Sequence, residues 1–157
     1  MADMACWLVK TEPDIFSIED FARERVTDWT GVRNYQARNF LRAMKVGEPV
    51  LVYHSNAEPP GVVGVARVHK QAVPDPTQFD RQSEYFDSKA TKDKPRWFCP
   101  DLEFVEKLKR MIPLDELRSL KALDGFRLLE RGSRLSVIPV LDKHFNTILK
   151  ISSKNSR

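Results

Sequence analysis

The 157-residue sequence has only two cysteines and three histidines, and they are widely scattered along the chain. A zinc site needs ligands at close spacing, which this distribution does not offer. Cys6 and Cys99 each lie among hydrophobic or aromatic residues, so we expect two buried, reduced thiols and no bound metal.

Long apolar runs are missing as well. No stretch approaches the roughly 18 apolar residues that a membrane-spanning helix needs. The first ten residues also lack the basic and then apolar order of a secretory signal. We therefore expect a protein that meets no membrane, located in the cytoplasm of a bacterial cell or in the nucleus of a eukaryotic one.

The sequence contains none of the common catalytic signatures. It has no nucleophile elbow, no phosphate-binding loop, no dinucleotide fingerprint and no zinc-protease helix. Ser55 directly follows His54, and neighbouring strand residues point to opposite faces, so this histidine is badly placed to activate the serine. We expect no enzymatic activity and no cofactor.

What the sequence does contain is an ordinary globular composition, with 41% hydrophobic and 31% charged residues. The length suits one domain, which we place at residues 1–151, followed by a disordered polar tail at residues 152–157. The net charge of +4, from 26 basic and 22 acidic residues, is compatible with a nucleic-acid partner but does not require one.

Hydrophobic periodicity and capping signals divide the chain into alternating strands and helices. Ser17 and Asp20 resemble a capping box, and Pro113 suits the first position of a helix. The result is an α+β fold, which we predict to be a small mixed β-barrel flanked by helices. The predicted strands are 5–10, 49–54, 62–70, 97–108 and 134–140, and the predicted helices are 17–25, 34–45, one from Pro113 and 141–150.

Several aromatic residues lie at element ends, where pockets form. Trp29 lies in a polar loop beside Gly31, where a role in the core is harder to argue, whereas Trp7 lies among apolar residues and suits the core. Asn34 lies at the start of a predicted helix, and Ser55 directly follows a predicted strand. At such positions an amide or hydroxyl has one of two roles: it reads the edge of a base, or it caps a helix or turn.

Several segments of the chain form a distinctive set of motifs: WLVKTEP at residues 7–13, WTGVRNYQARN at residues 29–39, YHSN at 53–56 and RLSV at 134–137. In these segments the chain resembles the EVE domain family. The resemblance runs from about Cys6 to Leu149. It implies a PUA-like fold, kinship with YTH domains, and recognition of a modified base in DNA or RNA.

The resemblance also implies the site residues. Trp29 would be the stacking platform, and the hydroxyl of Thr11 stands where the family usually has serine. The implied base-pocket residues are Trp29, Lys10, Thr11, Glu12, Asn34, Tyr53, Ser55, Arg134 and Ser136, and those for backbone phosphates are Arg33, Arg38 and Arg96.

The leading hypothesis is a non-catalytic reader that holds a flipped, modified cytosine or adenine in an aromatic pocket. Two other functions stay open at this point. One is an enzyme that acts on a modified nucleobase or nucleotide, with Glu12 or Lys10 in acid–base roles. The other is an interaction module whose groove takes a peptide.

Overall fold

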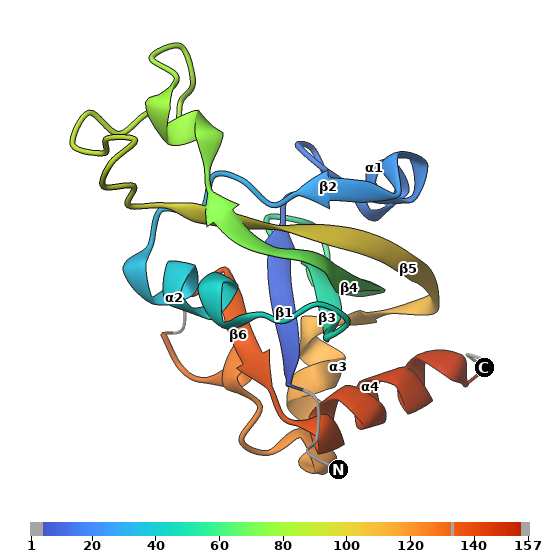
Figure 1. Cartoon of the computed structure of the whole chain (residues 1–157). Helices are drawn as coiled ribbons and strands as arrows, with labels where there is room; N and C mark the ends of the chain where they lie inside the picture. Colours follow the sequence, from blue (N-terminus) through green and yellow to red (C-terminus); the bar gives the residue numbers. More distant parts are fainter. Residues whose placement is uncertain (1–4, 133, 155–157) are drawn as a thin grey trace.

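A computed structural model of the chain describes residues 5–132 and 134–154. Its centre is one six-stranded mixed sheet, in the order β2-β5-β4-β3-β1-β6 (Figure 1). Among the described strands, only β1 and β3 pair in parallel, and the other pairings are antiparallel. The strands are β1 (Cys6–Thr11), β2 (Val26–Asp28), β3 (Pro49–His54), β4 (Gly61–Pro74), β5 (Phe98–Pro113) and β6 (Val137–Val140).

In the described ranges, four α-helices pack around this sheet. They are α1 (Ile18–Glu24), α2 (Tyr35–Ala43), α3 (Leu114–Ser119) and α4 (Asp142–Ser153). The predicted α+β class is confirmed, but the sheet is not closed into a barrel, because the edge strands β2 and β6 do not pair with each other in the described part of the chain. Four register irregularities between the long strands β4 and β5 bend them into a curved, open sheet.

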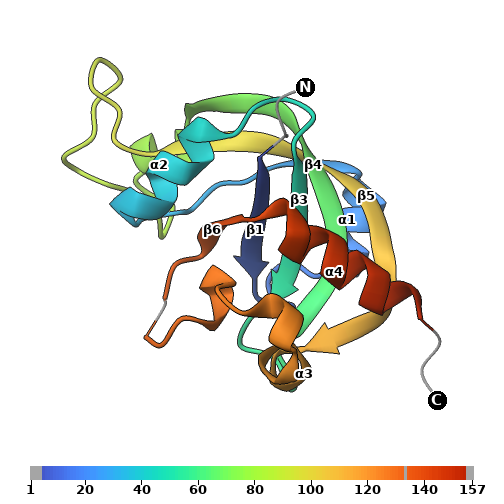
Figure 2. The ribbon, with the colours of Figure 1, turned by 90° about the horizontal axis from the view of Figure 1, so that it is seen from below.

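Both faces of the sheet are buried, because successive residues of its central strands are apolar. In β1, Trp7 and Val9 face one core with α1 and α2, whereas Cys6 and Leu8 face a second core with α3 and α4. Figure 2 shows α4 crossing the face of the sheet on this second side. The sheet is therefore covered by packed side chains on both faces.

The helix starts follow the predicted capping. The Ser17 side chain accepts from the Asp20 backbone while Asp20 accepts from the Ser17 backbone, which is a complete capping box. The Asn34 side chain accepts from the Ala37 N–H at 2.9 Å and caps α2. Pro113 is the residue before α3, one position earlier than expected.

Two segments differ in kind from the sequence prediction. Residues 26–28 form the short strand β2, since pairing with β5 stabilises a segment with no strand pattern of its own. Helix α4 continues through Ser152, which the prediction placed in a disordered tail, and Ser152 is buried with its hydroxyl bonded to the Leu149 carbonyl. Residues 155–157 of that predicted tail lie outside the described residues.

Cys6 and Cys99 are both buried, as expected. Burial raises the pKa of each thiol to about 12, so neither is a thiolate at neutral pH. None of the helices in the described ranges is long and apolar enough to cross a membrane.

Candidate functional site

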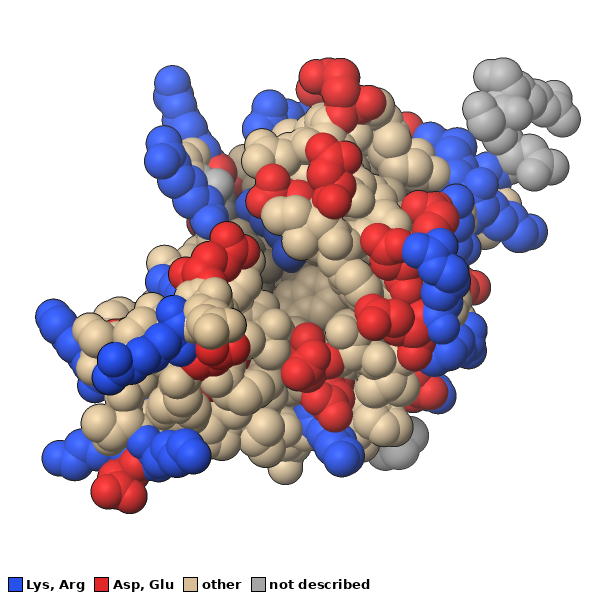
Figure 3. Space-filling view, turned by 90° about the horizontal axis from the view of Figure 1, so that it is seen from above, with Lys and Arg blue, Asp and Glu red and all other residues tan. Residues whose placement is uncertain are grey.

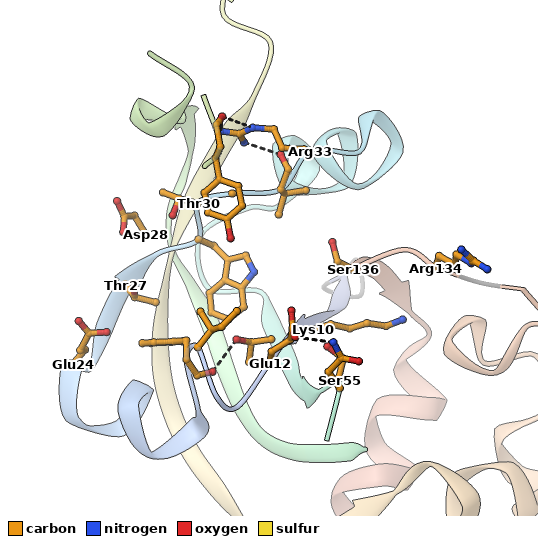
Figure 4. A pocket seen from close by; sticks show the side chains of 18 residues that line it. Lys10, Glu12, Glu24, Thr27, Asp28, Thr30, Arg33, Ser55, Arg134 and Ser136 are labelled. Atoms are coloured by element: carbon orange, nitrogen blue, oxygen red, sulfur yellow. Dashed lines mark hydrogen bonds between the residues drawn. The ribbon is translucent and has the colours of Figure 1, made fainter. Parts of the chain in front are cut away.

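A cavity of about 830 Å³ opens where the parallel strands β1 and β3 end. Figure 3 looks onto this hollow, whose mouth is bordered by both acidic and basic side chains, and Figure 4 shows its lining. Its volume lies in the range of small-molecule sites. The lining residues are Lys10, Thr11, Glu12, Ile15, Phe16, Glu24, Thr27, Asp28, Trp29, Thr30, Gly31, Val32, Arg33, Ser55, Asn56, Tyr85, Arg134 and Ser136.

Trp29 belongs both to the cavity wall and to the hydrophobic core. It is only 8% exposed and packs against Phe16 and Phe21, with ring centroids 6.1 and 5.9 Å away. The expectation that its polar loop argues against a core role is wrong, because the backbone N–H of Trp29 bonds to Pro100 and holds the loop against β5. Its indole N–H has no hydrogen-bond partner among the described residues and is not sealed from solvent.

The segment that ends β1 supplies the polar side of the cavity. The Thr11 hydroxyl donates to the Phe16 carbonyl at 2.8 Å, so it stabilises the turn before α1. Lys10 is half-buried, and burial lowers the pKa of its amine. Lys10 Nζ forms no ion pair within the described ranges and lies 5.9 Å from the centroid of the Tyr53 ring. Glu12 accepts a hydrogen bond from Asn56 Nδ2 at 2.7 Å.

The opposite wall depends on a buried carboxylate. Asp75 is fully buried and accepts from the Gly31 N–H, from the Thr77 N–H and hydroxyl, and from Arg33. Burial alone would raise the pKa of Asp75, but these hydrogen bonds outweigh burial and hold the pKa below its ordinary value. Asp75 thereby joins the Trp29 loop to the long segment after β4.

Arg33 also links the Trp29 loop to the long segment after β4, and we call this set of hydrogen bonds the Arg33 clamp. Its guanidinium donates to the Tyr85 carbonyl through Nε and Nη2, at 3.0 and 2.8 Å. The remaining bonds go to the carbonyl of Val32, to Asp75 and to the Thr77 hydroxyl. All five N–H donors are used within the chain, which leaves no unbonded donor for a phosphate, and the phosphate contact of Arg33 stays a prediction.

Tyr85 lies over Gly31 as a result of this clamp. Gly31 has a φ of +87°, and a Cβ at this position would lie 2.9 Å from the Tyr85 ring. Glycine is therefore required both by the backbone conformation and by the close approach of the ring.

The structure brings most of the predicted pocket residues together and places two elsewhere. Trp29, Lys10, Thr11, Glu12, Ser55, Arg134 and Ser136 all line the cavity. Asn34 does not line it, because its side chain caps α2. Tyr53 is 4% exposed and packs in the core on the α3 and α4 side of the sheet.

Arg38 and Arg96 lie outside the cavity, around an aromatic stack. Tyr35 stacks on Trp97 with ring centroids 4.8 Å apart, and the Arg38 guanidinium carbon lies 4.8 Å from the Tyr35 centroid. Arg38 donates to the Arg96 carbonyl and to Asn39 and has no carboxylate partner in the described ranges, whereas Arg96 lies 3.4 Å from Asp87. Arg38 is thus the better placed of the two for an external anion.

Sequence reasoning missed several lining residues for identifiable reasons. Phe16 precedes the Ser17 cap, and an apolar residue at that position was a usable signal for a side chain packed over the helix start. Tyr85 lies in the long proline-containing connection, where no periodicity indicates its position. The same holds for Asp75, which does not line the cavity but bonds to the residues of its wall. Asp28 and Thr27 belong to the strand β2 that was not predicted.

The geometry contains no cluster of three or more metal-ligating side chains in the part of the chain that is described. What it defines is a small α+β domain with an aromatic and polar cavity at the ends of two parallel strands. Residues 5–151 match the EVE domain family, and the chain belongs to that family.

Relatives and solved structures agree with this assignment. Human thymocyte nuclear protein 1 is 42% identical, with 94% of this chain and 74% of the relative covered. The human THYN1 protein, solved in complex with DNA containing 5-methylcytosine, has a TM-score of 0.92 at 40% identity and covers 97% of this chain and 99% of its own. A protein from Pseudomonas putida has a TM-score of 0.91 at 46% identity, covering 94% of this chain and 99% of its own.

Proposed function

We propose that this protein is a reader of a modified base in DNA, and that it holds the flipped-out base in the cavity beside Trp29. The observation that carries the proposal is the cavity itself, which presents an indole and polar groups at one set of strand ends. The human relative that shares this fold was solved with DNA containing 5-methylcytosine, which supports DNA as the partner.

The energetics favour a reader of moderate affinity. Flipping a base costs a few kcal/mol, and stacking on an aromatic side chain returns about 1–3 kcal/mol. The difference has to come from polar contacts at the base edge and from contacts to the DNA backbone. A modified base adds contacts inside the cavity, whereas backbone contacts are the same for every sequence.

The chemistry of the cavity favours binding over catalysis. Thr11, the hydroxyl residue nearest Glu12 in sequence, already donates to a backbone carbonyl, and the two buried thiols are protonated. An enzyme that acts on the base would leave the oligonucleotide with a changed or missing base. Incubating the protein with modified oligonucleotides and analysing the nucleosides by mass spectrometry is expected to return the starting base unchanged.

The test of the reader function is a comparison of oligonucleotides that differ only in one base. We expect 5-methylcytosine to be bound more tightly than cytosine in the same DNA, and free 5-methyl-2′-deoxycytidine to compete. Equal affinity for both DNAs would contradict the proposal, and tighter binding to the matching RNA would move the partner to RNA. Competition by peptides in place of nucleosides would favour an interaction module. A nuclear location in eukaryotes would suit a DNA partner.

Arg38 is expected to contact the DNA backbone. Replacing Arg38 with glutamine should weaken binding to modified and unmodified DNA by the same factor and lower the slope of log affinity against log salt by about one. Titrations at several salt concentrations measure this slope. Lys109→Gln, at an exposed position on β5, is the matched control and should leave the slope unchanged. A loss of base preference in Arg38→Gln would count against a pure backbone role.

A further inference from the structure

The carboxylate of Glu12 lies in the cavity without a cationic partner. Its only hydrogen bond among the described residues comes from Asn56 Nδ2, 2.7 Å from Oε1. No arginine, lysine or histidine of the described chain forms an ion pair with it. A carboxylate offers about four acceptor positions. Glu12 therefore keeps acceptor capacity for a ligand inside the cavity.

The position of this carboxylate is set by the backbone around it. Pro13 restricts Glu12 to extended conformations, so Lys10 and Glu12, two residues apart, leave the chain on the same side. The Ser55 N–H bonds to the Thr11 carbonyl at 3.0 Å, which ties the turn after β3 to the end of β1. In Figure 4, Lys10, Glu12 and Ser55 lie close together at this end of the cavity.

Asn56 holds the carboxylate from this turn. Its backbone has a φ of +50°, a left-handed conformation that asparagine adopts more readily than most residues. The turn thereby brings the Asn56 amide to Glu12 Oε1. One oxygen of the carboxylate is fixed, and the rotation of the group is restricted.

Lys10 and Glu12 together offer one donor group beside one acceptor group. A lysine ammonium only donates and an ionised carboxylate only accepts. The pairing edge of cytosine has an amino donor followed by two acceptors, a ring nitrogen and a carbonyl. Adenine likewise has an amino donor beside an acceptor ring nitrogen. Thymine and uracil have a carbonyl where cytosine has the amino group, which would face the carboxylate.

We infer that Glu12 reads the exocyclic amino group of the bound base, with Asn56 as its positioning residue and Lys10 as the donor to the neighbouring acceptor. This inference rests on the proposed function and assigns its specificity. The cavity selects amino-bearing bases of the cytosine and adenine type and rejects thymine and uracil, because a carbonyl beside the carboxylate is repelled and leaves the acceptor unsatisfied.

The test uses 5-methylcytosine and thymine, which share the methyl group and differ in the amino or carbonyl group at position 4 and in the ring proton that accompanies it. In otherwise identical single-stranded DNAs, the wild-type protein should prefer 5-methylcytosine by about tenfold to a hundredfold, the range of one good base-edge contact. Glu12→Gln keeps the shape of the side chain but adds a donor, so its preference should fall to about threefold or less or invert. Asn56→Ala should give an intermediate preference.

Asp14→Asn is the matched control, since it removes one negative charge from an exposed neighbouring position outside the cavity lining. It should keep the wild-type preference. If Glu12→Gln retains the full preference, or if the wild type does not distinguish the two bases while still preferring 5-methylcytosine to cytosine, Glu12 is not the reading group and the reader function stands. If the wild type does not distinguish 5-methylcytosine from cytosine, the proposed function itself fails.

Discussion

Replacing Trp29 with alanine is expected to remove the preference for a modified base and to lower the free energy of unfolding by about 3–5 kcal/mol. The two effects have one structural cause. Trp29 packs against Phe16 and Phe21 in the core while another part of its indole lines the cavity. The loss of stacking alone should weaken binding of the modified base by about tenfold to a hundredfold.

Because Trp29→Ala risks unfolding the domain, Trp29→Phe provides the decisive comparison. Phenylalanine keeps an aromatic face and most of the packing but lacks the indole N–H. We expect it to retain part of the affinity and most of the stability. Denaturant unfolding and titration with the modified oligonucleotide, both at a temperature where the variants are folded, measure the two effects separately. If folded Trp29→Ala bound as tightly and as selectively as the wild type, the aromatic pocket would be ruled out.

Asp75→Ala should cost about 3–5 kcal/mol of stability, because it leaves buried donors and the Arg33 charge without their partner. The Asp75 carboxylate joins Gly31, Arg33 and Thr77, so its loss should also release Tyr85 from the cavity wall. Asp75→Asn keeps the shape and should cost less. Urea unfolding at pH 7 measures the stability, and an Asp75→Ala protein as stable as the wild type would contradict this role.

The same carboxylate predicts how stability depends on pH. The pKa of Asp75 is lower in the folded protein than the ordinary unfolded value of about 3.9. Its contribution is therefore fully present above that value and is lost as the pH falls through the lower folded pKa. Unfolding measured from pH 5 downward should show a smaller loss of stability for Asp75→Asn than for the wild type. Equal acid sensitivity of the two proteins would argue against the shifted pKa.

Local signals in the sequence were enough for much of the fold. Ser17 and Asn34 cap their helices as predicted, and the apolar run around Leu8 forms a strand buried on both faces. The open sheet was not predictable, because closure depends on whether distant edges such as β2 and β6 meet. No local pattern encodes that distance.

The sequence indicated most of the residues that line the cavity, but not the hydrogen bonds that these and neighbouring residues form. The family resemblance placed Lys10, Trp29 and Ser55 in one cavity, and the structure does the same. The resemblance could not show that every N–H donor of Arg33 forms a hydrogen bond within the chain. The acceptors of these bonds lie at residues 32, 75, 77 and 85, which are mostly distant in sequence. For Asn34 the sequence left two roles open, helix capping and contact with a base, and in the structure its side chain caps α2.

The three tryptophans allow a direct test of the central claim that a base occupies this cavity. The indole N–H of Trp7 donates to Glu48 at 2.9 Å and that of Trp97 donates to Asp87 at 2.7 Å, whereas that of Trp29 has no partner among the described residues. A nitrogen–proton NMR spectrum separates the three indole signals, and Trp29→Phe assigns one of them. Titration with DNA containing 5-methylcytosine should shift the Trp29 signal strongly and the Trp7 signal little. A saturating titration that leaves the Trp29 signal in place would contradict the claim.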